Sequence, residues 1–330
     1  MDVYRDEDAD LALIRGRRVA VIGYGNQGRA QALNLRDSGV AVAVGLPPGS
    51  ASRGRAEGDG FDVMTAAQAS EKADLVVMLA ADERHSGIYR EEVAPNLAEG
   101  SALVFAHGLS IRFGLIEPRP DLDVLLVAPK GPGTALRSEY ERGGGLIALF
   151  AVHQDSTGRA EALALSYGAA IGSGRAGMLR TSFAEECEAD LFNEQAVLWG
   201  AIPELIHAGF ETLVDAGFSP EIAYFECLTE VKLIADLIYE RGIAGMREAI
   251  SNTAEFGALK GGTRIVTADT RTEMRRILRE VRGGGFVREL IADAEAGYPR
   301  LGASRAEAAA HPIEQVGARL KALAARRADG

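Results

Sequence analysis

The chain has 330 residues, more than one hydrophobic core usually supports, so two domains are expected. Its net charge of −11 argues against nucleic acid as the main partner, because binding phosphates needs a basic surface. Two cysteines are too few for a disulfide framework or a four-cysteine zinc site, and we expect a reducing, cytoplasmic location. We expect neither a signal peptide nor a membrane span, because no apolar run is long enough.

The first predicted strand, at residues 19–22, runs directly into the sequence GYGNQG, which a helical pattern and a second strand from residue 40 follow. This order gives the G-x-G-x-x-G spacing the context that a dinucleotide site requires. Its first glycine permits a tight turn, its second lets the backbone approach a pyrophosphate, and its third allows close helix packing. The predicted cofactor residues of this turn are Gly23, Tyr24, Gly25, Asn26, Gln27 and Gly28.

The loop after the second strand bears on the choice of cofactor. An NAD-selective site usually has an acidic residue there, which bonds the ribose 2′-hydroxyl. Here residues 45–53 contain no acid, and Ser50, Ser52 and Arg53 can donate to a 2′-phosphate. The alternative is that these three residues are only polar residues of a surface loop, with no role in cofactor binding. We therefore predict NADPH over NADH.

Further apolar strands are predicted at residues 74–80, 102–106 and 123–129, with helical segments between them. Near-continuous apolar strands that alternate with helices indicate a Rossmann-type, doubly wound parallel sheet. His107 and Lys130 follow two of these strands, at the edge where such sheets bind ligands. Position alone leaves a functional and a structural role equally open for both.

The second half of the chain reads as helical. We predict a Rossmann domain over residues 1–180 and an all-α domain over residues 181–330, with glycine and proline between the helices. The predicted helices cover residues 185–198, 202–216, 220–239, 244–252, 272–282 and 286–295.

Two pairs of carboxylates stand at i,i+4 spacing on these helices. The first is Asp190 and Glu194, with Glu186 one turn earlier, and the second is Glu226 and Glu230. Carboxylates side by side on an otherwise apolar helix repel each other unless a cation balances their charge. An oxygen-only donor set suits a hard cation such as Mg²⁺. A solvated acidic face is the alternative, although two such pairs make it less favourable.

The joint pattern of GYGNQG, AHG, APKGPG, EADLFNEQAVLWG, AYFECLTEVKLIADLIYE and ISNTAEFG resembles ketol-acid reductoisomerase in its short, class I form, over almost the whole chain. The resemblance implies an enzyme of valine and isoleucine biosynthesis. It would convert 2-acetolactate or 2-aceto-2-hydroxybutyrate to 2,3-dihydroxy-3-methyl carboxylic acids by alkyl migration and reduction. It also implies NADPH and two Mg²⁺ ions as cofactors. A knotted or intertwined helical domain would make a homodimer, or a higher homo-oligomer, with shared active sites.

The resemblance also assigns roles to individual residues. Asp190 and Glu194 would be metal ligands of one subunit, and Glu226 and Glu230 would come from the partner. Ser251 would contact the substrate carboxylate. His107, Lys130 and Glu186, with Glu230, would form the catalytic polar site, and Gly133 of APKGPG would join the cofactor site.

The sequence departs from the family pattern at Thr134, Arg180, Asn193 and Thr229, and Ala80 and Ala81 stand where the family motif LPDE has leucine and proline. They leave the substrate open. One alternative is a paralogous NADPH- and metal-dependent reductase or reductoisomerase of a related 2-keto acid in a specialised pathway. An alternative of another class is a non-catalytic, cofactor-binding regulatory protein, which the intact carboxylate pairs disfavour.

Overall fold

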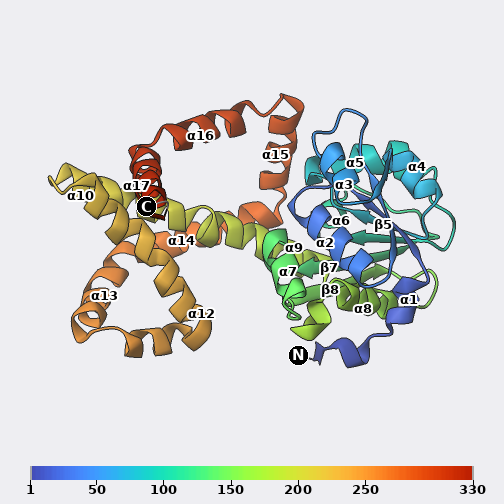
Figure 1. The fold of residues 1–330 in the computed structure, drawn as a ribbon, viewed down its shortest axis with the longest axis horizontal. Helices are drawn as coiled ribbons and strands as arrows, with labels where there is room; N and C mark the ends of the chain where they lie inside the picture. Colours follow the sequence, from blue (N-terminus) through green and yellow to red (C-terminus); the bar gives the residue numbers. More distant parts are fainter. Residues whose placement is uncertain (1, 329–330) are drawn as a thin grey trace. The chain divides into compact units, whose positions relative to one another are not determined.

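The computed structural model describes residues 2–328, with side chains described through residue 323 (Figure 1). It divides into two compact units between Ala189 and Asp190, inside helix α9 (Phe183–Asn193). The domain boundary expected after residue 180 lies at the end of the last strand, just before this helix, and stays a prediction. An N-terminal α/β unit followed by an all-helical unit confirms the predicted fold class.

The N-terminal unit is built on one nine-stranded sheet in the order β1-β9-β8-β7-β6-β5-β2-β3-β4. The six strands from β7 to β4 along this order pair in parallel, as the Rossmann pattern predicts. Two antiparallel pairings, β7 with β8 and β1 with β9, make the sheet mixed rather than purely parallel. The strands are β1 (Val3–Tyr4), β2 (Arg18–Ile22), β3 (Ala41–Gly45), β4 (Asp62–Met64), β5 (Leu75–Met78), β6 (Ala102–Phe105), β7 (Asp123–Pro129), β8 (Ala148–Gln154) and β9 (Met178–Arg180).

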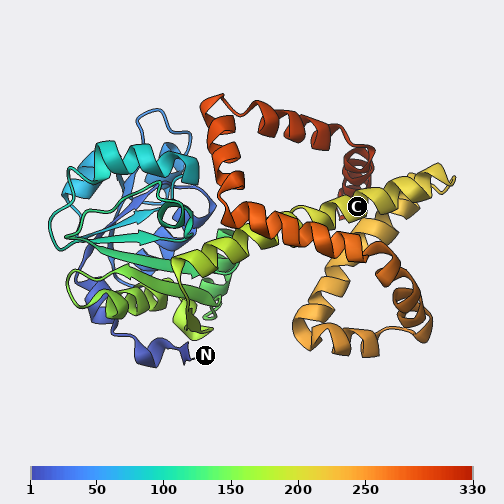
Figure 2. The same cartoon turned by 180° about the vertical axis from the view of Figure 1, so that it is seen from behind.

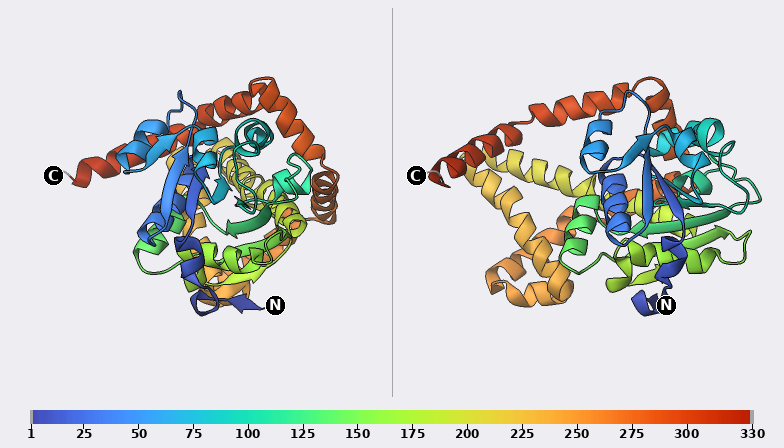
Figure 3. Two further views of the ribbon diagram at one scale, coloured as in Figure 1. Left: turned by 90° about the vertical axis from the view of Figure 1, so that its right-hand side faces the viewer. Right: turned by 45° about the vertical axis from the view of Figure 1, so that its right-hand side comes forward.

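Helices cover both faces of this sheet (Figures 2 and 3). Successive side chains of a strand point to opposite faces, so Val19 and Val21 join one buried core and Ala20 and Ile22 join the other. Burial on both sides explains why the strands are apolar at nearly every position. The helices are α1 (Leu11–Arg15), α2 (Asn26–Asp37), α3 (Arg53–Gly58), α4 (Ala66–Glu71), α5 (His85–Ile88), α6 (Leu109–Arg112), α7 (Gly133–Glu141) and α8 (Ala160–Ala170).

The regular structure of the C-terminal unit is helical throughout the residues described, 190–328. Two π-helical turns, η5 (Glu194–Leu198) and η6 (Phe225–Thr229), interrupt the predicted helices at residues 185–198 and 220–239. In Figure 1, α15, α16 and α17 follow one another with sharp bends. The α-helices are α10 (Ala201–Asp215), α11 (Pro220–Tyr224), α12 (Glu230–Ala249), α13 (Asn252–Ile265), α14 (Ala268–Arg282), α15 (Gly285–Glu295), α16 (Pro299–Ala310) and α17 (Pro312–Ala328).

The helical unit buries little apolar surface within one chain. Among its described residues, one buried cluster consists of Phe210, Ala223, Ile313 and Val316, from α10, α11 and α17. Large apolar side chains elsewhere in the unit face solvent, among them Trp199, Leu233, Phe256 and Leu259, each more than 60% exposed. Exposed apolar area of this extent marks an interaction surface. None of the described helices is both long and apolar enough to cross a membrane.

Candidate active site

The glycine-rich turn between β2 and α2 has the geometry that its sequence predicts. Gly23 has φ +103°, and a side chain there would meet the Leu79 carbonyl oxygen at 2.4 Å. At Gly28 an added Cβ would lie 2.3 Å from the Gly23 carbonyl oxygen, so the helix packs directly on the turn. At Gly25 nothing lies within 4 Å of such an atom. The turn is therefore closed on the protein side and open at the residue that would approach a pyrophosphate.

The loop after β7 packs against this turn. The Asn26 side-chain oxygen accepts from the Thr134 backbone N–H at 3.0 Å, and the Gln27 amide donates to the Gly131 carbonyl oxygen at 2.8 Å. An added Cβ at Gly133 would lie 2.1 Å from the Asn26 carbonyl oxygen. The two loops at the ligand edge of the sheet are therefore joined by Asn26, Gln27 and Gly133. These contacts are within the protein and give the three residues a structural role.

Tyr24 is buried beneath the turn. Its hydroxyl donates to Asp59 at 2.8 Å, and Arg29 forms an ion pair with the same carboxylate at 2.7 Å. Burial, with the Asp59 hydrogen bond, raises the pKa of Tyr24 far above its ordinary value. Tyr24 therefore stays protonated and holds α2 to the end of α3.

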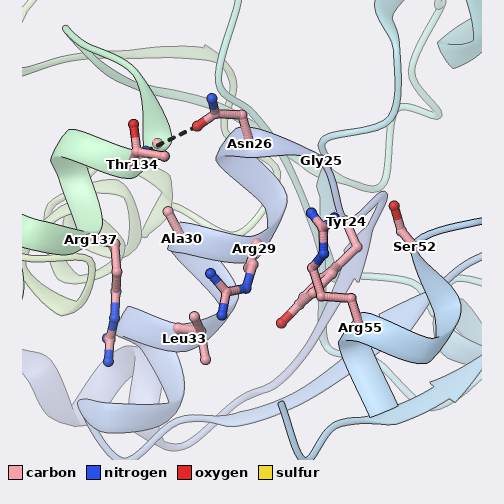
Figure 4. A pocket seen from close by; sticks show the side chains of 11 residues that line it. Tyr24, Gly25, Asn26, Arg29, Ala30, Leu33, Ser52, Arg55, Thr134 and Arg137 are labelled. Carbon is pink, nitrogen blue, oxygen red and sulfur yellow. Dashed lines mark hydrogen bonds between the residues drawn. The ribbon is translucent and has the colours of Figure 1, made fainter. Parts of the chain in front are cut away.

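A pocket of about 270 Å³ lies over the first turns of α2 (Figure 4). Ser52 and Arg55 line one side of it, and Thr134 and Arg137 line the other. The Arg55 side chain makes no hydrogen bond or ion pair with the described residues, and its guanidinium points toward the turn at Tyr24. Arg137, by contrast, is neutralised by acidic neighbours.

The residues predicted for a 2′-phosphate take different positions. Ser52 lines this pocket, whereas Arg53 donates to the Val63 carbonyl oxygen at 2.8 Å and pairs with Glu57 at 3.1 Å. Ser50 uses its hydroxyl oxygen to accept from the Ser52 backbone N–H at 3.3 Å. Arg55, two residues after Arg53, was not predicted: its position beside this loop is visible in the sequence, but its lack of a side-chain partner is not.

His107 and Lys130, the two polar residues predicted at strand ends, meet at Glu186. Glu186 is 2% exposed and accepts hydrogen bonds from His107 Nδ1 at 3.1 Å, from Lys130 Nζ at 3.2 Å and from the Gly108 backbone N–H at 2.8 Å. An added Cβ at Gly108 would lie 2.4 Å from the Phe183 carbonyl oxygen, so α9 packs tightly on this loop. The sequence did not indicate the Gly108 donor.

This cluster is an ion pair in its resting state. Burial opposes the charge on Glu186, but His107, Lys130 and the Gly108 N–H outweigh it and lower the pKa of that carboxyl. Burial likewise opposes charge on His107, while contacts with Cys187 and Glu186 raise its pKa well above the ordinary value. Cys187 Sγ lies 3.9 Å from His107 Nε2. The arrangement holds N–H donors and an anion side by side at the carboxyl ends of β6 and β7.

Asp190 follows Glu186 by one turn of the same continuous helix. One ligand atom from each of His107, Glu186 and Asp190 lies within 4.8 Å of the others. Glu194 opens the π-turn η5, in which the Trp199 N–H donates to the Glu194 carbonyl oxygen at 3.0 Å. Such π-turns are frequent at functional sites.

The second carboxylate pair lies on exposed helix. Glu226 is in the π-turn η6, and Glu230 begins α12. Neither makes a side-chain hydrogen bond or ion pair with the described part of this chain, and neither joins a three-residue ligand cluster there. Ser251 is the N-cap of α13, where its hydroxyl accepts from the Ala254 N–H at 3.1 Å. One chain alone therefore does not bring the two predicted pairs together.

Comparison with known proteins gives two family matches. Residues 13–177 match the NADPH-binding domain of acetohydroxy acid isomeroreductase, and residues 183–326 match the C-terminal domain of ketol-acid reductoisomerase. An NADH-preferring ketol-acid reductoisomerase from an uncultured archean is 43% identical, with a TM-score of 0.95 over 98% of this chain and 99% of that one.

More distant structures share only the fold. An NAD-binding semialdehyde dehydrogenase protein from Cupriavidus necator is 17% identical, with a TM-score of 0.61 over 81% of this chain and 98% of that chain. A pyrroline-5-carboxylate reductase from Coxiella burnetii is 16% identical, with a TM-score of 0.52 over 81% and 96%.

Proposed function

We propose, from the premise that this chain belongs to the ketol-acid reductoisomerase family, that it converts 2-acetolactate or 2-aceto-2-hydroxybutyrate to 2,3-dihydroxy-3-methyl acids. Membership makes it an oxidoreductase of branched-chain amino-acid biosynthesis, so the non-catalytic alternative no longer applies. The observation that carries the proposal is the buried Glu186, held by His107 and Lys130 at the ligand edge of the sheet.

The residues of this chain fit a pair of hard cations. Asp190 and Glu194 offer carboxylate oxygens from one chain, and Glu226 and Glu230 of the partner subunit would complete the set. His107 is a poor ligand as long as its ring is an imidazolium, because both ring nitrogens then carry protons and neither offers a lone pair. When bound, two Mg²⁺ ions lower the pKa of a substrate hydroxyl and polarise the adjacent carbonyl, and a nicotinamide supplies hydride.

The protein's own part is to hold protons and charge around the reacting oxygens. Lys130 Nζ and the His107 ring present donors beside Glu186, which anchors both and balances their charge. These groups are fixed by β6, β7 and α9, so they need no reorganisation during the reaction. Glu186 in turn is positioned to exchange a proton with a substrate hydroxyl through either neighbour.

We propose NADPH as the cofactor, although the similar archaeal structure is described as NADH-preferring. Ser52 and Arg55 line the pocket beside the glycine turn, and Arg55 has no acidic partner among the described residues. An unpaired guanidinium next to a hydroxyl suits a 2′-phosphate better than a ribose hydroxyl. Arg53, already bound to Val63 and Glu57, contributes less.

We also propose a homodimer, or a higher homo-oligomer, whose active sites are shared. The exposed apolar side chains of the helical unit, such as Leu233 and Phe256, need a covering surface. Glu226 and Glu230 are exposed, and neither forms a side-chain hydrogen bond or ion pair with the residues that the structure describes. A second copy would cover the apolar helices and bring these carboxylates to the first pair.

The remaining alternative is a plain reductase that has kept the metal site but not the migration. Of the departures from the family pattern, Thr134 lines the pocket beside the glycine turn, and Arg180 forms an ion pair with Glu161. The deciding assay follows cofactor oxidation with 2-acetolactate and with 3-hydroxy-3-methyl-2-oxobutanoate, each with and without Mg²⁺. We expect Mg²⁺-dependent turnover of both compounds. Reduction of the second compound alone would replace the proposal with the plain reductase.

A further inference from the structure

A second histidine, His85, lies buried between two loops at the ligand edge of the sheet. Its Nε2 is 3.0 Å from the carbonyl oxygen of Ala80, in the loop after β5, and its Nδ1 is 3.0 Å from the hydroxyl of Ser110, after β6. His85 is 3% exposed and Ser110 is 1% exposed. The ring also lies beside Phe105, the last residue of β6, with centroids 6.1 Å apart.

The hydrogen-bond partners fix the tautomer of this ring. Burial lowers the pKa of His85, so the imidazole is neutral and carries one N–H. A carbonyl oxygen can only accept, so the proton is on Nε2 and Nδ1 accepts from the Ser110 hydroxyl. Asp82 Oδ1 lies 3.6 Å from Nδ1, beyond hydrogen-bond reach. A single neutral ring thus bonds one loop as donor and the other as acceptor.

Each of the two loops supports a different part of the proposed site. The loop at Ala80 packs on the dinucleotide turn, because a Cβ at Gly23 would meet the Ala80 nitrogen at 2.5 Å. Ser110 is in α6, whose N-cap is Gly108, the residue that donates its N–H to Glu186. His85 is therefore the hydrogen-bonded connection between the turn for the cofactor and the segment that holds Glu186.

We propose that His85 is a positioning residue for the reduction step: by joining Ala80 to Ser110 it sets the spacing between the dinucleotide turn and the His107–Glu186 pair. This inference rests on the proposed function. It predicts that loss of the bridge misplaces the two reactants, because small errors in their distance cost much rate.

Three variants and one control test the bridge. His85→Gln keeps a donor for Ala80 and an acceptor for Ser110, whereas His85→Leu removes both. Ser110→Ala removes one bond and keeps the ring, so it serves if His85→Leu fails to fold. The matched control is Ser70→Ala, because Ser70 is as buried as Ser110 and its hydroxyl has no partner among the described residues.

The measurement is the reduction of 3-hydroxy-3-methyl-2-oxobutanoate by the Mg²⁺-loaded enzyme, with the deuterium isotope effect of a 4-deuterated cofactor. We expect kcat to fall about ten- to a hundredfold in His85→Leu, with a larger isotope effect. We expect a smaller fall of the same kind in Ser110→Ala. His85→Gln should keep kcat within about threefold of wild type, and Ser70→Ala should match wild type.

A role in stability alone would lower the melting temperature of His85→Leu but leave kcat and the isotope effect per folded site unchanged, and that result would overturn the inference. A folded His85→Gln as slow as His85→Leu would also overturn it. If the wild type reduces no substrate, the proposed function fails instead. In that case the dissociation constant of NADPH, measured by titration, tests the bridge. Weaker binding in His85→Leu and restored binding in His85→Gln would support the bridge. Equal binding in all variants would refute it.

Discussion

The side-chain oxygen of Asn26 accepts a hydrogen bond of 3.0 Å from the backbone N–H of Thr134. Asn26 is the first residue of α2 and Thr134 the second residue of α7, so this contact brings the starts of two helices together. Helix N-termini carry partial positive charge and unpaired N–H groups. Two helix N-termini beside Gly25 therefore favour an anionic ligand there. The close approach of the two helices depends on the backbone contact at Gly133.

Replacing Gly133 by alanine is expected to weaken cofactor binding and to destabilise the protein. The new methyl group would lie 2.1 Å from the Asn26 carbonyl oxygen, so the two loops must separate. Overpacking of this kind costs about 1–3 kcal/mol. Gly54→Ala, where nothing lies within 4 Å, is the control and should be neutral or slightly stabilising. The measurements are thermal unfolding and NADPH titration, and a Gly133→Ala protein that equals wild type in both would contradict this account.

The His107–Glu186 pair predicts a pH dependence of stability. The pKa of His107 is raised in the fold, so its stabilising contribution is fully present below the unfolded value of 6.5 and is lost as pH rises through the folded pKa. The advantage of wild type over His107→Gln should fall by up to about 1.4 kcal/mol per pH unit in that window.

The experiment compares unfolding of metal-free wild type, in chelator, with His107→Gln from pH 6 upward. His153→Gln, at an exposed histidine of β8, is the matched control for the loss of an imidazole. An advantage of wild type that stays constant or grows with pH would show that His107 is not held as a cation.

Much of the fold is readable in the sequence, because strands buried on both faces must be apolar throughout. Residues 19–22, 75–78, 102–105 and 123–129 carry that signal and are all strands. The missed strands β1, β4 and β9 have two or three residues each, too few to form a pattern. β8 carries a similar apolar run and was within reach of the same reasoning.

The site was only partly predictable. His107 and Lys130 follow strands, so the topology places them at one edge, but their meeting at Glu186 depends on how α9 packs against Gly108. The π-turns at Glu194 and Glu226 were beyond prediction, because i,i+4 carboxylates look the same on a regular helix. His85 was missed because a single histidine in a short polar segment carries no signal before its partners are known.

Arg55 is expected to favour NADPH over NADH. A charged hydrogen bond to a 2′-phosphate is worth about 1.5–3 kcal/mol, so kcat/KM for NADPH should fall roughly ten- to a hundredfold in Arg55→Ala, with little change for NADH. Arg53→Ala is the comparison, and its effect should be smaller, because Arg53 is bound to Val63 and Glu57. Equal or NADH-favouring efficiency in the wild type would overturn the choice of cofactor.

Asp190→Asn is expected to abolish Mg²⁺-dependent turnover of 2-acetolactate while NADPH binding stays nearly intact. Asp190 belongs to the carboxylate set, and the glycine turn is formed by other elements. The neutral amide is a weaker ligand for a hard cation. Glu185→Gln, an exposed position on the same helix, is the control and should keep its activity. Substantial turnover, or loss of NADPH binding in the folded variant, would count against the role of Asp190.

The last prediction concerns sharing of the active site between subunits. Glu226 and Glu230 join no ligand cluster with Asp190 among the described residues of one chain, so a partner subunit is the expected source of the second pair. In a dimer of Asp190→Asn and Glu226→Gln chains, one site would collect both substitutions and the other neither. With random pairing, about half the dimers would be mixed, each with one intact site, so about a quarter of wild-type activity should return. Each variant alone should be inactive.

Co-expression with two different affinity tags gives isolated mixed dimers even if the subunits do not exchange. Mixed dimers that are folded, loaded with Mg²⁺ and inactive would mean that each chain supplies both carboxylate pairs to its own site.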